Sequence, residues 1–223
     1  MQLIEFMIAE NLNKIKAQLG SNIKLIVVTK TRSIEEIMQV YEAGHKIFGE
    51  NRVQELCEKQ KLLPNDIEWH LIGHLQTNKV KYIAPFIDTI HSVDSFKLLQ
   101  VINKEAAKNN RVINCLLQGY VAKEETKFGM LFEEIEALLL EPTLQELKNI
   151  KITGLMGMAT NTNNEEQVAT EFGTLKKWFE KLKEIYFKNN NDFKELSMGM
   201  SGDYLFAAAN GSTMVRIGSL IFS

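Results

Sequence analysis

Ile23-Lys24-Leu25-Ile26-Val27-Val28-Thr29-Lys30 is the stretch that decides the fold, because it is short, largely apolar and followed directly by a helix signal. Apolar residues on both faces are typical of a strand in a buried parallel sheet. Ser33-Ile34-Glu35-Glu36 then forms a capping box that begins a helix, and Gly44 ends that helix. A buried strand followed by an amphipathic helix is the repeating unit of an α/β fold.

The same strand–helix unit recurs along the rest of the sequence. The eight predicted strands are 23–29, 46–49, 67–72, 88–91, 112–121, 150–155, 195–198 and 214–217. Helical periodicity follows each of the first seven strands, and one further helix carrying Ile4 to Leu19 precedes the first strand. A doubly wound open sheet usually has about five or six strands, so the count favours a closed barrel. We therefore expect an α/β protein with a single (β/α)8 TIM barrel over residues 1–223 and an extra N-terminal helix.

The composition excludes several classes of function. The 223 residues carry 26 basic and 28 acidic side chains, a net charge of -2, so we expect neither nucleic acid nor a membrane surface as partner. No apolar run is long enough to span a bilayer, and the first residues lack the pattern of a signal peptide. Cys57 and Cys115 fit neither a zinc site nor a disulfide framework. These features predict a cytoplasmic protein.

Lys30 is the most informative residue at the strand ends, where the active sites of barrels lie. A lysine that ends a buried strand projects into the barrel mouth, where partial desolvation lowers its pKa and supplies the neutral amine that forms a Schiff base. The alternative is a lysine whose ammonium group reaches bulk water past an apolar stem. The periodicity leaves these two interpretations open.

Three arginines and two loops are further candidates for binding a ligand at the barrel mouth. Only four of the 26 basic residues are arginines, and Arg32, Arg52 and Arg216 lie near predicted strand ends or helix starts at the mouth. For Arg32 and Arg52 we favour ion pairs at helix starts. Ser201-Gly202 and Gly218-Ser219 follow the seventh and eighth strands, and barrels frequently bind phosphate with those two loops. Asp203 could instead serve only as a helix N-cap.

His70 and His74 are the remaining candidates for a metal site. They lie four residues apart on a strand-to-loop segment, so they need not share a face, and we see no acidic third ligand beside them. We expect no metal site here. We interpret Glu50, Glu55 and Glu58 as part of a solvated helix face.

Seven blocks of the sequence resemble a known protein family. The matching blocks are Val28–Thr31, Phe48–Glu55, Trp69–Lys79, His91–Ser95, Gly154–Met156, Leu196–Asp203 and Gly211–Gly218, which cover nearly the whole stretch from Leu25 to Phe222. In this order they resemble the pyridoxal phosphate homeostasis proteins. The resemblance implies a barrel like the N-terminal domain of alanine racemases, with pyridoxal 5′-phosphate (PLP) as its cofactor. We expect the protein to be a monomer.

The resemblance also implies the roles of individual residues. Lys30 would hold PLP as an internal aldimine and Asn51 would lie beside the ring, while Ser201, Gly218 and Ser219 would hold the phosphate. Arg216 would face the pyridine nitrogen and keep it unprotonated, which makes the cofactor a poor electron sink. We expect these cofactor-binding residues and no dedicated catalytic residue.

One position departs from the family pattern. Tyr120 stands where an asparagine usually follows the Gln-x pair of the fifth strand, and the resemblance places that strand end near the pocket of the ring. Lys127 and Gly129 return to the pattern.

Three functions fit these residues. The first is a PLP-binding protein that buffers the cofactor or delivers it to PLP-dependent apo-enzymes, without a substrate of its own and thus not an enzyme. The second is a fold-type III PLP-dependent amino-acid racemase or decarboxylase. Racemisation by two bases needs an acid–base group on each face of the substrate, and related racemases take the second from another domain, so we favour the first function. The third, a Schiff-base aldolase without cofactor, leaves Arg216 and the phosphate loops unexplained.

Overall fold

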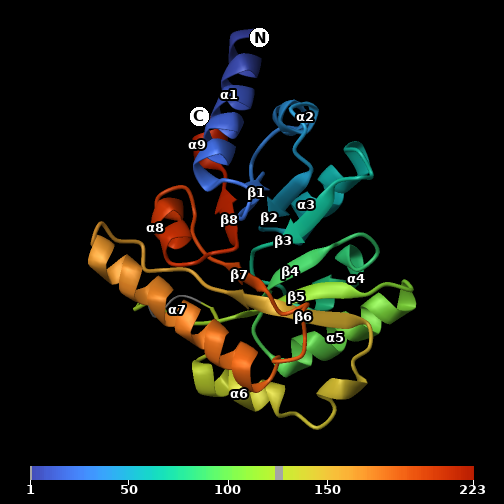
Figure 1. Ribbon diagram of the computed structural model, residues 1–223. Helices are drawn as coiled ribbons and strands as arrows, with labels where there is room; N and C mark the ends of the chain where they lie inside the picture. Colours follow the sequence, from blue (N-terminus) through green and yellow to red (C-terminus); the bar gives the residue numbers. More distant parts are fainter. Residues whose placement is uncertain (1, 124–127) are drawn as a thin grey trace.

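The computed structural model of the protein describes residues 2–123 and 128–223, and Lys127 lies outside the described residues. Eight parallel strands close into a barrel in sequence order, so the prediction of a TIM barrel is confirmed (Figure 1). The strands are β1 (Lys24–Val28), β2 (Ile47–Glu50), β3 (Glu68–Leu71), β4 (Thr89–Val93), β5 (Ile113–Gln118), β6 (Ile150–Met156), β7 (Glu195–Ser197) and β8 (Met214–Ile217).

Helices surround this barrel, as the helical periodicity predicts. They are α1 (Gln2–Leu19), α2 (Ile34–Glu42), α3 (Val53–Leu62), α4 (Val80–Ile83), α5 (Phe96–Lys108), α6 (Phe132–Leu139), α7 (Glu165–Ile185), α8 (Tyr204–Ala209) and α9 (Ser219–Phe222), with short 3-10 turns at Thr77–Lys79 and Leu144–Glu146. The predicted capping box of α2 is confirmed. The Ser33 hydroxyl accepts the N–H of Glu36, and the Glu36 carboxylate accepts the N–H of Ser33.

The fifth strand is shorter than we predict from the sequence. The apolar run continues to Val121, but β5 ends at Gln118. Beyond that point the chain pairs with its own returning segment: the N–H of Tyr120 donates to Met130 O, and the N–H of Met130 donates to Gln118 O. The N–H of Gly119 still donates to Met156 O at the end of β6, but from Tyr120 onward the chain bonds to its own returning segment.

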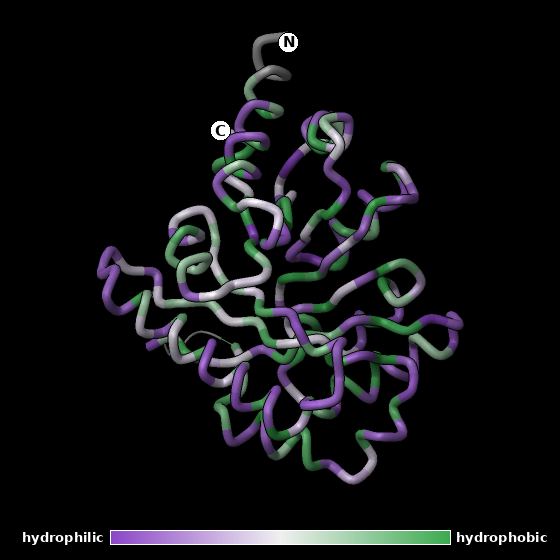
Figure 2. Tube along the Cα trace, in the orientation of Figure 1, coloured by the Kyte–Doolittle hydropathy of each residue, from purple (hydrophilic) through white to green (hydrophobic). Residues whose placement is uncertain are grey.

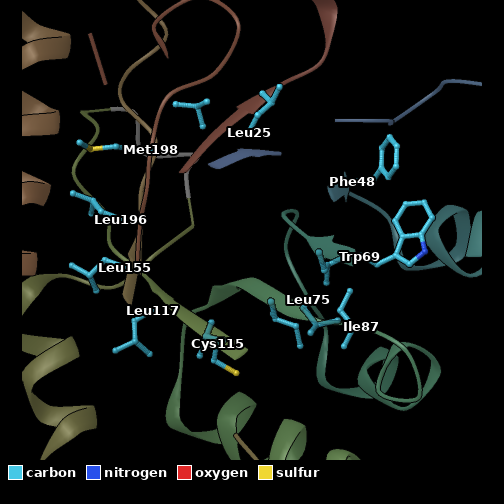
Figure 3. Packing of buried hydrophobic residues seen from close by; sticks show 14 of the residues in the cluster. Leu25, Phe48, Trp69, Leu75, Ile87, Cys115, Leu117, Leu155, Leu196 and Met198 are labelled. Carbon is cyan, nitrogen blue, oxygen red and sulfur yellow. The ribbon is translucent and has the colours of Figure 1, made fainter. Parts of the chain in front are cut away.

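The core has two layers because successive side chains of a strand face opposite sides. Outward side chains such as Phe48, Trp69, Leu117 and Leu196 pack under the helices (Figure 3). Inside the barrel, Leu116, Met156 and Met214 form a separate small cluster. The helices alternate hydrophobic and hydrophilic residues along their length, as expected for elements with one buried face (Figure 2).

The extra N-terminal helix is confirmed, and it packs beside the last helix of the structure (Figure 1). Leu12 and Ile15 are buried, and the Asn11 amide donates to the carbonyls of Ile221 and Ser223. Within residues 2–123 and 128–223, no helix combines the length and the apolar character needed to cross a membrane.

We predict that Gly73→Ala destabilises the barrel, because a Cβ at this position would lie 2.3 Å from Asn51 O and 2.8 Å from Asn51 Cα. Overpacking of this kind costs roughly 1–3 kcal/mol of unfolding free energy. Gly202→Ala is the matched control, since a Cβ there meets nothing within 4 Å. Urea unfolding followed by circular dichroism measures both. Equal stability of the two variants would contradict the close approach of Gly73 to Asn51.

Candidate cofactor site

Lys30 follows β1 at the carboxyl end of the barrel. Thr29 faces outward, where its hydroxyl donates to Glu50 Oε1 at 2.6 Å, so the next side chain points to the mouth. Lys30 is exposed, so its side chain reaches solvent at the mouth. Thr31 adopts a left-handed backbone with φ of 62°, an unfavourable conformation for a β-branched residue.

A buried lysine holds the backbone on both sides of Lys30. Lys59, on α3, donates to Thr29 O at 2.6 Å, to Glu50 Oε1 at 2.6 Å and to Glu55 Oε1 at 2.7 Å. Glu55 Oε1 also accepts the N–H of Thr31 at 2.7 Å. The strained turn at Thr31 is therefore stabilised by an ion-pair network behind it, which fixes where the Lys30 side chain starts.

This network corrects one expectation from the sequence. Glu50 does not lie on a solvated helix face but ends β2, fully buried, and Glu55 is partly buried; Glu58 is exposed as expected. Burial raises the pKa of the Glu50 carboxyl, and hydrogen bonds from Lys59 and Thr29 oppose that rise. Among the described residues, Glu50 Oε2 is one of two buried side-chain oxygens without a hydrogen-bond partner.

The two candidate phosphate loops meet beside β1. The N–H of Gly218 donates to Ser201 Oγ at 3.4 Å, which links the loop after β7 to the loop after β8. A Cβ at Gly218 would lie 2.8 Å from Val28 O, so only glycine permits this close approach to the strand that carries Lys30. Ser219 is exposed directly beyond Gly218, and the space beside Gly202 is open.

Asp203 occupies the N-cap position of α8 without capping that helix through its side chain. Its carboxylate instead accepts the N–H of Met200 at 2.5 Å. It therefore closes the loop that carries Ser201 and Gly202.

Arg216 lies inside the barrel and is only 4% exposed. One terminal nitrogen donates to Ser197 Oγ at 2.6 Å and the other to Gly157 O at 3.1 Å. Burial lowers the pKa of Arg216 to about 10, while Asp203 opposes the shift, so the guanidinium stays charged at neutral pH. This side chain places a fixed cation below the mouth.

The other arginines at the mouth lie on the surface. Arg32 pairs with Glu36 at 3.2 Å, four residues on along α2, so the predicted ion pair at a helix start is confirmed. Arg52 is exposed at the N-cap of α3. Asn51 directly precedes it, half-buried, and its backbone packs against Gly73. The structure thus brings Lys30, Asn51, the two candidate phosphate loops and Arg216 to one end of the barrel.

The two candidate metal ligands do not come together. His74 is exposed, lies 3.4 Å from Asp94 and stacks on Phe128 with ring centroids 4.3 Å apart, whereas His70 is fully buried. The fold brings to His70 two carboxylates that we did not expect.

His70 with these carboxylates, Glu68 and Asp88, offers three ligand atoms within 4.8 Å of one another. All three groups are already engaged. His70 hydrogen-bonds Glu68 at 2.9 Å, Lys24 lies 3.5 Å from the same carboxylate, and Asp88 accepts from Thr89 at 2.6 Å. They could hold a metal ion only after giving up these contacts.

Comparison with known proteins places the chain in a class. The family described as alanine racemase, N-terminal domain, matches residues 7–223, and the closed parallel barrel described above is the fold of that class.

Its relatives narrow the class to one family. Pyridoxal phosphate homeostasis proteins of Aquifex aeolicus and Schizosaccharomyces pombe are 44% and 33% identical to this chain, over 89% and 91% of it and 86% and 84% of their own lengths. The chain belongs to the pyridoxal phosphate homeostasis protein family.

Solved structures agree with this assignment. PipY of Synechococcus elongatus PCC7942, solved without PLP, superposes with a TM-score of 0.90 at 34% identity and covers 97% of this chain and 100% of its own. The PLP-bound form of PipY gives 0.87 at 35% identity, over the same shares of the two chains. An alanine racemase of Clostridium difficile gives 0.73 at 18% identity, over 96% of this chain and 55% of its own, which shows the fold alone.

We predict that Lys59→Met destabilises the protein strongly, because it removes the cation that partners the fully buried Glu50. Breaking a buried ion pair from one side costs roughly 3–5 kcal/mol. Lys61→Met, at an exposed position of the same helix, is the control and should change the unfolding free energy by less than about 0.5 kcal/mol. Chemical unfolding gives both values.

A second variant separates the buried charge from simple packing. Adding Glu50→Gln to Lys59→Met removes the unpaired carboxylate, so part of the lost stability should return. If the double variant is no more stable than the single one, the charge of Glu50 is not what Lys59 compensates.

Proposed function

We propose that this protein binds pyridoxal 5′-phosphate at the mouth of the barrel and serves in PLP homeostasis, holding the cofactor through Lys30 without a dedicated substrate. The observation that carries the proposal is the meeting of three groups at one end of the barrel. The Lys30 amine is exposed just after β1. The Ser201 hydroxyl and the Gly218 N–H join the loops after β7 and β8, and the buried Arg216 guanidinium lies on β8, which pairs with β1.

The donor set fits the cofactor. Bound PLP supplies an aldehyde and an electron-poor ring. The Lys30 amine would hold the cofactor through that aldehyde. Ser201, Gly218 and Ser219 would hold the phosphate through their hydroxyl and backbone N–H groups, and Asn51 would lie beside the ring.

Arg216 explains why such a protein would carry the cofactor without using it. A guanidinium only donates hydrogen bonds, and its pKa of about 10 keeps it charged at neutral pH. A cation of this kind facing the ring nitrogen disfavours protonation there. The ring then withdraws electrons weakly, which is unfavourable for racemisation or decarboxylation.

The relatives support the proposal. Those cited above are named pyridoxal phosphate homeostasis proteins, and one solved form of PipY holds PLP. We extend it to a cytoplasmic monomer that receives free PLP and delivers it to PLP-dependent apo-enzymes.

We predict that Lys30→Ala abolishes covalent attachment while leaving weak binding through the phosphate loops. Borohydride reduction of the PLP-loaded protein followed by intact-mass measurement detects the attachment, and absorbance detects the bound cofactor. Lys97→Ala, an exposed lysine on α5, is the matched control and should be labelled like the wild type. Labelling of Lys30→Ala equal to the control would overturn the assignment of Lys30.

The absence of a dedicated substrate is tested separately. We expect no rapid α-proton exchange when the PLP-loaded protein is incubated with pooled amino acids in D2O and their α-proton signals are followed by NMR. Lys30→Ala serves as the control for exchange caused by free PLP. Rapid loss of one amino acid's signal that depends on Lys30 would identify an enzyme and its substrate, and would replace the carrier function with a racemase-like activity.

A further inference from the structure

A chain of hydrogen bonds runs through the barrel from Arg216 to a carboxylate near its amino end. Arg216 donates to Ser197 Oγ at 2.6 Å, and Ser197 Oγ lies 2.9 Å from His91 Nδ1. His91 Nε2 lies 2.7 Å from His70 Nδ1, and His70 Nε2 lies 2.9 Å from Glu68 Oε1. These residues come from β8, β7, β4 and β3, and all except Glu68 are buried.

The two ends of this chain fix the direction of its bonds. Arg216 can only donate, so Ser197 Oγ accepts from it. At the other end, the hydrogen bond from His70 lowers the pKa of Glu68, so its carboxylate is ionised at neutral pH and only accepts. His70 therefore carries its hydrogen on Nε2, and in the neutral ring its Nδ1 is an acceptor.

The remaining two bonds follow from this tautomer. His91 must donate from Nε2, because otherwise two lone pairs would face each other across 2.7 Å. Its Nδ1 then accepts the hydroxyl hydrogen of Ser197. Burial lowers the pKa of His91 well below its usual value, and His70 and Arg216 lower it further, so this ring is neutral. Every donor in the chain thus points away from Arg216 and toward Glu68.

The opposite direction would require a doubly protonated His70. His70 Nδ1 would then donate to His91 Nε2, and His91 Nδ1 would donate to Ser197 Oγ. The serine oxygen would accept from both His91 and Arg216, and its own hydrogen would find no acceptor among these groups. The first arrangement gives each of these hydrogens an acceptor, whereas the opposite one leaves the Ser197 hydrogen without an acceptor among these groups and adds a second buried cation to Arg216, so we favour the first.

We propose that Glu68, His70, His91 and Ser197 are positioning residues that hold the Arg216 guanidinium in the orientation in which it faces the cofactor ring. The proposal rests on the proposed function for its ligand. Ser197 commits its hydrogen to His91, so it offers Arg216 only an acceptor. Together with Gly157 O, which accepts at 3.1 Å from the other terminal nitrogen, it fixes both arms of the fork.

The tautomers are tested on the cofactor-free protein with ¹⁵N-labelled histidine. Long-range ¹H–¹⁵N correlation distinguishes the two neutral tautomers, and single histidine variants assign the signals. We expect Nε2–H on both His70 and His91. His45→Gln is the control, because His45 is a buried histidine that bonds Ile47 O outside the chain, and it should leave both signals unchanged. An Nδ1–H tautomer of His91 would overturn the proposal.

The far end of the chain is tested by Glu68→Met. Asp88 lies 4.0 Å from His70 Nε2, beyond hydrogen-bond distance, but it could move to replace Glu68, so the variant is combined with Asp88→Asn. We expect His70 and His91 to become mixtures of tautomers. Unchanged tautomers in the combined variant would mean that the carboxylate does not set the direction.

The positioning role is tested with Ser197→Ala. We expect PLP affinity to fall about tenfold, because one charge-assisted hydrogen bond to Arg216 is lost. We also expect faster rotation of the guanidinium, seen as merged Arg216 Nη signals in the cofactor-free protein. Ser197→Thr keeps the hydroxyl and should restore both properties. Ser212→Ala is the control, since Ser212 is a buried serine whose hydroxyl bonds only backbone carbonyls of Leu196, Met198 and Met214.

The outcomes separate this proposal from the function on which it rests. If the wild type binds no PLP, the proposed function fails, while the tautomers and the Arg216 signals still decide whether the chain exists and holds the guanidinium. If the wild type binds PLP and Ser197→Ala keeps both its affinity and its slow guanidinium rotation, the positioning role is wrong.

Discussion

The pairing of β1 with β8 is the constraint on which the rest of the structure depends. In this register Ile26 lies opposite Arg216 and Val27 opposite Ile217. The pairing closes the sheet and sets Gly218 against Val28, two residues before Lys30. An amine from the first strand and a cation from the last therefore share one mouth. Without closure, neither the joined loops at Ser201 and Gly218 nor the polar chain across the interior could form.

The fold could be predicted from the sequence because it depends on local patterns. Apolar runs of strand length alternate with amphipathic helices, and each unit is readable within a short window, as the confirmed capping box at Ser33 illustrates. The positions of Lys30, Ser201 and Gly218 follow from the same rhythm, because active residues of barrels lie at the carboxyl ends of strands. The end of β5 was not predictable in this way, since the loop beyond Gln118 pairs with itself.

The polar interior could not be predicted, because it depends on which strands face one another after closure. His91 on β4 and Ser197 on β7 have no sequence relation that would join them. The Lys59 network escaped prediction for a related reason: the sequence interpretation assigns Glu50 and Glu55 to one helix face, but Glu50 ends a strand and only Glu55 lies on a helix. One sequence signal for the polar interior was available. Glu68 and His70 are alternate polar residues in an otherwise apolar strand, which places both side chains inside the barrel.

The closure by β8 also affects when the protein can bind its ligand. A chain emerging from the ribosome presents β1 first and β8 last of the eight strands, and domains fold as units during synthesis. Lys30 is therefore exposed long before Arg216 and Gly218 exist beside it. A cofactor cannot template the early folding of such a chain. It can only stabilise the finished barrel by mass action, so that the stability of the folded protein follows the concentration of its ligand in the cell.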